Sequence, residues 1–107
     1  MRKKIFDGEN SVTLDQVLLQ LPGCEPIEHH LRYYSYGRRI DNYYHLDPEG
    51  VTASYVSVLT QNGILSPIES HAEIWIYGAE QNITKAEQRI LVEMEKIKNH
   101  YLITSQI

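Results

Sequence analysis

Hydrophobic residues recur at helical spacing near the beginning of the chain. Their positions follow the i, i+3, i+4, i+7 pattern that places side chains on one face of a helix. Thr13 is followed three residues later by Gln16, the arrangement of a capping box, and Pro22 stops the pattern. We therefore expect a short helix over residues 13–21. Its apolar face consists of Leu14, Val17, Leu18 and Leu21.

A second helical pattern, longer and more regular, lies near the end of the chain. Thr84 and Glu87 form another capping box, and the pattern predicts a helix over about residues 85–101. Its apolar face consists of Ile83, Ala86, Ile90, Met94, Ile97 and Tyr101. Its opposite face is charged and is expected to lie in water: Glu87, Arg89, Glu93, Lys96 and Lys98.

Between these helices the pattern changes to that of β-strands. Residues 28–46 are rich in tyrosine, a strand former, and indicate a hairpin with turn chemistry at Gly37 or at Asp41 and Asn42. Alternate residues of a strand point to opposite faces. One face would belong to the core and carry Leu31, Tyr33, Tyr44 and Leu46. The other would carry His30, Arg32, Tyr34, Tyr36, Tyr43 and His45.

Three further features complete the predicted sheet. Residues 47–50 have the composition of a type I turn, and residues 73–77 form a strand that ends at Gly78. Residues 51–60 are rich in β-branched side chains and are followed by the hairpin signal of Asn62 and Gly63. A helix capped by Thr52 is the alternative for this segment.

These elements predict an α+β fold in one domain spanning residues 1–107. A small antiparallel sheet of three to five strands has the short N-terminal helix and the longer C-terminal helix packed on one face. Residues 1–10 are expected to be mobile. Two helices on one face leave the other face open, which favours a partner or self-association as a homodimer.

Composition and charge restrict the class of protein. The 107 residues are 42% hydrophobic and 22% charged, as in an ordinary globular domain. The net charge of −4 weighs against a nucleic-acid partner, and no lysine or arginine occurs between Ile40 and Thr84, so an acidic surface is expected there. No apolar run predicts a signal peptide or a membrane helix, and we expect a cytoplasmic protein that does not bind membranes.

The strongest candidate chemistry is a binding surface on the predicted hairpin. Tyrosine offers a large contact area at low rotamer entropy, and arginine offers planar, bidentate donors for anionic groups. We therefore predict a small non-enzymatic binding or regulatory module for a protein partner or an anionic ligand. Tyrosines that only pack across strands explain the pattern equally well. The predicted binding residues are Arg32, Tyr34, Tyr36, Arg38, Arg39, Tyr43 and His45.

Two other functional classes remain as alternatives. A winged-helix DNA-binding regulator requires residues 52–62 to be helical, and such a helix would lack lysine and arginine for phosphate contacts. A small metal-dependent enzyme would use His30, His45 and His71 as ligands. The chain contains none of the common nucleotide-binding or hydrolase motifs, and no base accompanies Cys24, so we predict no catalytic residue, metal site or cofactor.

Overall fold

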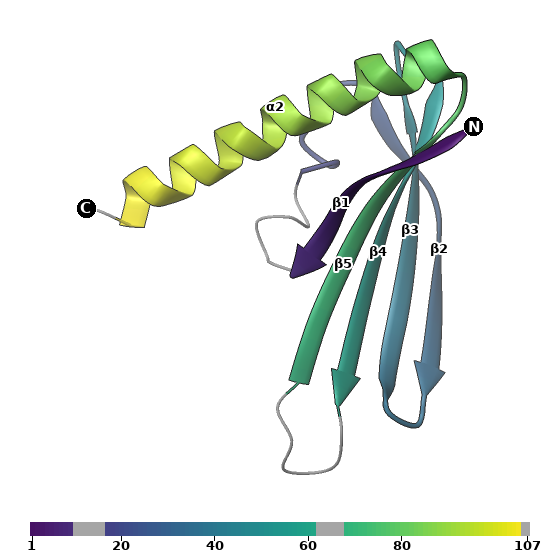
Figure 1. The fold of residues 1–107 in the computed structure, drawn as a ribbon, viewed down its shortest axis with the longest axis vertical. Helices are drawn as coiled ribbons and strands as arrows, with labels where there is room; N and C mark the ends of the chain where they lie inside the picture. The colour runs from purple at the N-terminus through teal and green to yellow at the C-terminus, as the bar shows by residue number, and fades with distance from the viewer. Residues whose placement is uncertain (10–16, 62–67, 106–107) are drawn as a thin grey trace.

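A five-stranded antiparallel sheet and one long helix make up the fold (Figure 1). The structure is a computed structural model that describes residues 1–9, 17–61 and 68–105. It confirms an α+β fold with an antiparallel sheet and a C-terminal helix. The elements are β1 (Arg2–Glu9), β2 (Cys24–Tyr34), β3 (Gly37–Leu46), β4 (Val51–Gln61), β5 (Ile68–Tyr77) and α2 (Glu80–Ser105).

Strands β2 to β5 are adjacent in chain order, and β1 joins the free side of β5. The order across the sheet is therefore β1-β5-β4-β3-β2, and every pair is antiparallel. The β2–β3 hairpin turns through Ser35 and Tyr36, with Tyr34 opposite Gly37. Gly37 has a φ of 158°, and a Cβ atom there would collide with the backbone oxygen of Leu59 on β4. The turn therefore requires glycine at this position.

The core lies between α2 and one end of the sheet. Strands β2 to β5 have 10 or 11 residues each. They are about 35 Å long, whereas a helix is only about 10 Å wide. Figure 1 shows α2 crossing the sheet near one end, with β2 to β5 extending well beyond it. Among the described residues, the buried core side chains include Val17, Leu18, Leu46, Val51, Ile74, Ile76, Ile83, Ala86 and Ile90.

One face of the sheet is consequently core at one end and open at the other. Tyr44 and Leu46 lie beneath α2 with exposed fractions of 8% and 0%. Leu31 and Tyr33 share that face but are exposed by 44% and 73%. The prediction that these four residues form the core is therefore right only for Tyr44 and Leu46, because the helix does not reach the far end of the strands.

The predicted N-terminal helix is not seen. Residues 10–16 lie outside the described part of the chain, and residues 17–20 form turns. The amide of Leu21 donates to the carbonyl of Leu18 at 3.2 Å, and that of Cys24 donates to Leu21 at 3.3 Å. Bonds spanning three residues wind the chain more tightly than an α-helix does. The apolar pattern is nevertheless buried at Val17, Leu18 and Leu21.

Both ends of the chain differ from the prediction. Arg2–Glu9, expected to be mobile, forms the edge strand β1, with Ile5 and Phe6 packed against the core. Helix α2 begins at Glu80 rather than near residue 85. Thr84 lies inside it and donates its hydroxyl to the carbonyl of Glu80 at 3.1 Å. Thr84 is therefore not a cap, because the strand end at Gly78 lets the helix begin earlier.

The middle of the chain is a strand, so the helical alternative for residues 52–61 is wrong. Val51–Gln61 pairs with strands on both sides. Asn62 and Gly63 lie outside the described residues, although the strands they connect pair as a hairpin. Residues 47–50 do form a turn, but the amide of Gly50 donates to the carbonyl of Leu46 across four residues, which is not the predicted type I bond.

Arg89 of α2 ties two turns to the helix instead of lying in water as predicted. Its guanidinium donates to the carbonyl of Pro22 at 2.9 Å and to the carbonyl of Asp47 at 2.8 Å. It also forms a two-pronged ion pair with Glu49, at 2.7 Å and 2.9 Å. The Glu49 side chain is only 5% exposed. One of the acids expected on an acidic surface is therefore an internal partner of the helix.

Candidate binding surface

The predicted binding residues come from both faces of the β2–β3 hairpin. Strand alternation places five of them on the face away from α2: Arg32, Tyr34, Arg39, Tyr43 and His45. Arg38 lies on the α2 side, where it lines a hollow with Leu19 and Leu59. The prediction that Arg38 and Arg39 share one surface is therefore wrong, because neighbouring residues of a strand point to opposite faces.

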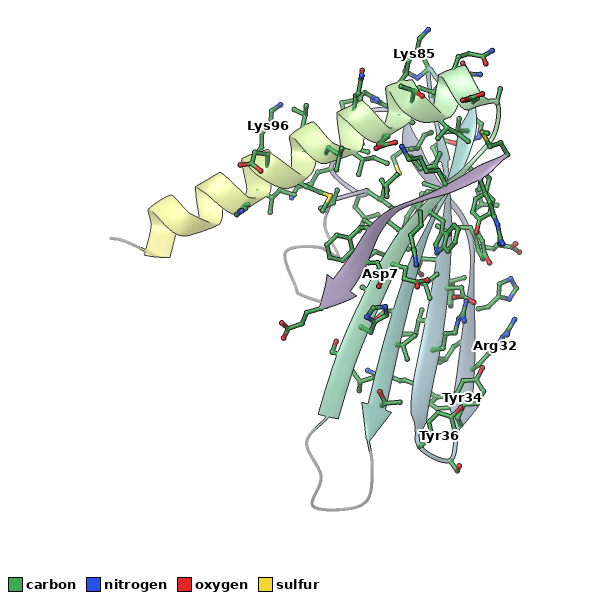
Figure 2. The ribbon with its side chains drawn as sticks, viewed as in Figure 1. Asp7, Arg32, Tyr34, Tyr36, Lys85 and Lys96 are labelled. Atoms are coloured by element: carbon green, nitrogen blue, oxygen red, sulfur yellow. The ribbon has the colours of Figure 1, made fainter. Side chains whose placement is uncertain are left out.

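The far end of the hairpin concentrates exposed rings and positive charge. Tyr34 and Tyr36 stack with their centroids 5.5 Å apart and their planes at 11° (Figure 2). They remain 43% and 54% exposed. Arg32 lies on the same face as Tyr34 and Arg38 on the opposite face, and neither arginine has an ion-pair or hydrogen-bond partner within the described residues. This end of the sheet therefore presents aromatic surface together with two uncompensated guanidinium groups.

Arg39 has a structural partner. Its Nε donates to Asp41 Oδ1 at 2.9 Å, and the Asp41 side chain is only 4% exposed. The hydrogen bond to Asp41 raises the pKa of Arg39. A buried carboxylate that loses its cation is strongly destabilising. Arg39 therefore contributes to the fold at this position, and its guanidinium is already occupied.

Tyr43 and His45 are likewise engaged. The Tyr43 ring meets the His30 ring edge-on, with centroids 5.9 Å apart. His45 Nε2 lies 3.1 Å from the Asp47 carboxylate. Both residues are half-buried. The middle of the open face is therefore internally paired, in contrast to the hairpin end.

Trp75, which the sequence did not single out, occupies the other side of the open face. The guanidinium of Arg2 lies 5.1 Å from the centre of the Trp75 ring, and Lys4 Nζ lies 5.5 Å from it. The indole donates to Glu73 Oε2 at 3.0 Å. Alternation along β5 would have placed Trp75 on this face. The two cations could not be found because β1 was not predicted.

The three histidines of the metal hypothesis do not form a site. Across the strand pairs, His30 is opposite Asp41, His45 is opposite Glu25 and Thr52, and His71 is opposite Val58 and Glu9. Among the described residues, the group with metal-ligand geometry is instead Asp7, His71 and Glu73, whose ligand atoms lie within 4.8 Å of one another. The structure thus separates His30 and His45 from His71.

Lys4 already neutralises this group. Lys4 Nζ lies 2.7 Å from Asp7 Oδ2 and 3.6 Å from Glu73 Oε1, and His71 Nε2 lies 2.7 Å from Asp7 Oδ1. The hydrogen bond between Lys4 and Asp7 raises the pKa of Lys4 and lowers the pKa of Asp7. A metal ion would have to displace the ammonium group. The arrangement is that of an ion-pair network on the sheet surface, around the Asp7 side chain labelled in Figure 2.

Cys24 stands at the start of β2 and is half-buried. Burial raises the pKa of its thiol, an effect that the positive charge of Arg89 partly opposes. A raised pKa reduces the thiolate fraction, and the thiolate is the nucleophile. The environment of Cys24 is therefore that of a packed thiol.

Comparisons with other proteins give no family for this chain: no known protein family, curated protein sequence or solved structure matches it. The part of the chain that the structure describes contains no helix that is both long and apolar enough to span a membrane. Arguments about function therefore depend on the geometry of the chain itself.

Proposed function

We propose that this protein is a small binding module whose β2–β3 hairpin end takes up an acidic segment of a partner protein. The observation that carries the proposal is the exposed, stacked pair of Tyr34 and Tyr36 at the same hairpin end as Arg32 and Arg38, two arginines without partners among the described residues. Elsewhere on the open face, Lys4 and Arg39 already have carboxylate partners.

The stacked rings favour binding because they are organised in advance. A tyrosine has few rotatable bonds, and stacking against a neighbour fixes the ring further. Less side-chain entropy is then lost when a partner covers Tyr34 and Tyr36. Arg32 and Arg38 project from opposite faces of the same hairpin end. A segment that wraps around this end can therefore pair its carboxylates with both guanidinium groups.

The charge distribution favours an acidic protein over a nucleic acid. Phosphate backbones are bound by many cations acting together, and affinity falls steeply with salt as those contacts are screened. The chain has a net charge of −4, and only two arginines at the hairpin end lack partners in the described structure. A short acidic segment requires only a few such contacts.

Charge reversal at the hairpin end tests this proposal. We expect Arg32→Glu/Arg38→Glu to abolish capture of a specific protein from the native host while shifting the melting temperature by no more than about 2 °C, since surface substitutions cost little. The matched control is Lys85→Glu/Lys96→Glu, which reverses two exposed charges on α2 and should retain capture (Figure 2). Arg39 is left unchanged because it pairs with Asp41.

The captured protein then supplies a direct measurement. Its acidic segment, made as a labelled peptide, should bind wild type and lose at least about tenfold in affinity with Arg38→Glu alone, since one desolvated charge pair contributes about this much. Equal loss of capture by the hairpin and α2 variants would indicate a non-specific charge effect. Retained capture by the hairpin variant, or no specific capture by wild type, would refute the proposal.

A further inference from the structure

The two edges of the sheet are protected to different degrees. An edge strand presents unpaired N–H and C=O groups and is usually blunted by lysines, bulges or a covering helix. β1 has all three: it carries Lys3 and Lys4, its pairing is interrupted by a bulge between Lys4 and Phe6, and it contacts α2. Lys3 also pairs with Glu87 of α2 at 2.7 Å. This edge is therefore closed to further pairing.

The edge at β2 lacks these protections along most of its length. A bulge after Pro26 blunts one end, but the pairing with β3 is regular from Glu28 to Tyr34. No lysine occurs in the strand, and every residue after Cys24 is exposed. The exposed large hydrophobic side chains of the strand are Ile27 (55%), Leu31 (44%), Tyr33 (73%) and Tyr34 (43%). Figure 1 shows that α2 leaves the sheet on the opposite side, past β1, so that no helix of the described residues covers the outer side of β2.

We propose that β2 pairs with β2 of a second copy of this chain, in antiparallel register about His30. A two-fold axis through His30 places Glu28 opposite the second copy's Arg32, and Arg32 opposite its Glu28. Both side chains lie on the face away from α2. Opposite charges directly across antiparallel strands stabilise the pair. The two sheets become one continuous sheet of ten strands, five from each copy.

The sequence of β2 selects this register. In the same alignment Ile27, the residue at the bulge, comes opposite the second copy's Tyr33, which brings two exposed apolar side chains near each other. Moving the axis to Leu31 would place His30 opposite Arg32 and remove both charge pairs. Moving it to Arg32 would place two guanidinium groups together. The His30 register instead pairs Glu28 with Arg32 at both ends and keeps both copies of α2 on one side of the sheet.

This inference replaces self-association through the sheet face, which the sequence had indicated, with association through its edge. Both proposals use Arg32, but only the dimer interface uses Glu28, because Glu28 has no part in the partner site. Glu28→Arg leaves Arg32 and Arg38 in place. Loss of the dimer with retained partner capture would therefore separate the two proposals.

Sedimentation velocity over a range from about 5 to about 500 µM tests the pairing, because edge-strand association is expected to be of moderate affinity. Wild type should approach twice its monomer mass of 12.4 kDa. Glu28→Arg and Arg32→Glu should each weaken dimerisation by at least about tenfold, because two favourable charge pairs become two repulsive ones. Both sites are exposed, and unchanged circular dichroism checks that each variant is folded.

An experiment that mixes the two charge-reversed variants gives the most direct test of the register. In an equimolar mixture of the Glu28→Arg and Arg32→Glu variants, each end of the interface would again pair one guanidinium with one carboxylate. The mixed dimer should therefore form more readily than the dimer of either variant alone. The double variant Glu28→Arg/Arg32→Glu should also dimerise. Monomeric wild type at the highest concentration would overturn the proposal. Failure of both rescues would overturn the His30 register and, with it, the assigned interface.

Discussion

Replacing Arg89 by methionine should destabilise the fold more than any other exposed-face substitution on α2. Methionine keeps the apolar stem of the side chain but removes the guanidinium. Glu49, whose side chain is 5% exposed, then loses a two-pronged ion pair, and the carbonyls of Pro22 and Asp47 lose their donors. The substitution therefore separates the polar contacts of Arg89 from its packing.

The size of the effect follows from this arrangement. Removing one partner of a buried ion pair costs about 3–5 kcal/mol. The Arg89 side chain is 29% exposed, so water can reach part of the site and the lower end of that range applies. We expect a loss of about 3 kcal/mol in the free energy of unfolding. For a chain of this length that corresponds to a drop of roughly 13 °C in melting temperature.

Chemical denaturation of a double-mutant cycle measures the effect. Arg89→Met, Glu49→Met and the double variant should show a coupling energy of at least about 1.5 kcal/mol, because removing both partners leaves no unpaired buried charge. Lys85→Met serves as the matched control on the same helix, at an exposed lysine. A loss below about 1 kcal/mol for Arg89→Met, or strictly additive effects, would contradict the view that this residue holds the two turns on the helix.

Three further predictions concern a turn, a thiol and an ion pair. Gly37→Ala should lower the free energy of unfolding, measured by urea titration, by about 2 kcal/mol or more. Gly50→Ala should lower it by less, because a Cβ at Gly50 meets nothing within 4 Å. Equal losses for the two variants would contradict this prediction. Cys24 should react with a chromogenic disulfide reagent more slowly than a model thiol at about pH 8, because burial raises its pKa; a faster reaction would show a thiolate-stabilising site. Lys4 lowers the pKa of Asp7 in the folded state, so the ionised Asp7 carboxylate stabilises the fold at pH values above its ordinary pKa of 3.8. This contribution to stability is lost as the pH falls through the lower pKa of the folded state. The stability difference between wild type and Asp7→Asn should therefore shrink on acidification, and a constant difference would show that the pair is not linked to folding.

The parts of the fold predicted correctly are those with a strong local pattern. The hairpin around residues 28–46, the strand at residues 73–77 and the C-terminal helix each have a period that survives without knowledge of their neighbours. β1 was missed because it is short, polar at both ends and paired with the most distant strand in the sequence. The stability of β1 depends on its contacts with β5 and α2, and the sequence of β1 alone does not predict these contacts.

The candidate surface was predicted in composition but not in geometry. Alternation correctly grouped Arg32, Tyr34, Tyr43 and His45, because that rule needs only strand identity. The roles of Arg38 and Arg39 depended on the turn position, which Gly37 sets at Ser35 and Tyr36 rather than further along. The burial of Asp41 and Glu49 follows from partners on the same strand or on another element, Arg39 and Arg89. A sequence pattern does not reveal which charges such contacts neutralise.

Because α2 covers only one end of the strands, the free energy of local opening is expected to vary along each strand. Amide protons near Leu46, Val51 and Ile76 are shielded by the packed layer and should exchange with solvent only when the whole domain unfolds. Those near Tyr34 and Gly37 can open by separation of the hairpin alone. Substitutions of the exposed side chains at the distal end, away from the close approach at Gly37, can therefore change the chemistry of this surface with little effect on the free energy of global unfolding.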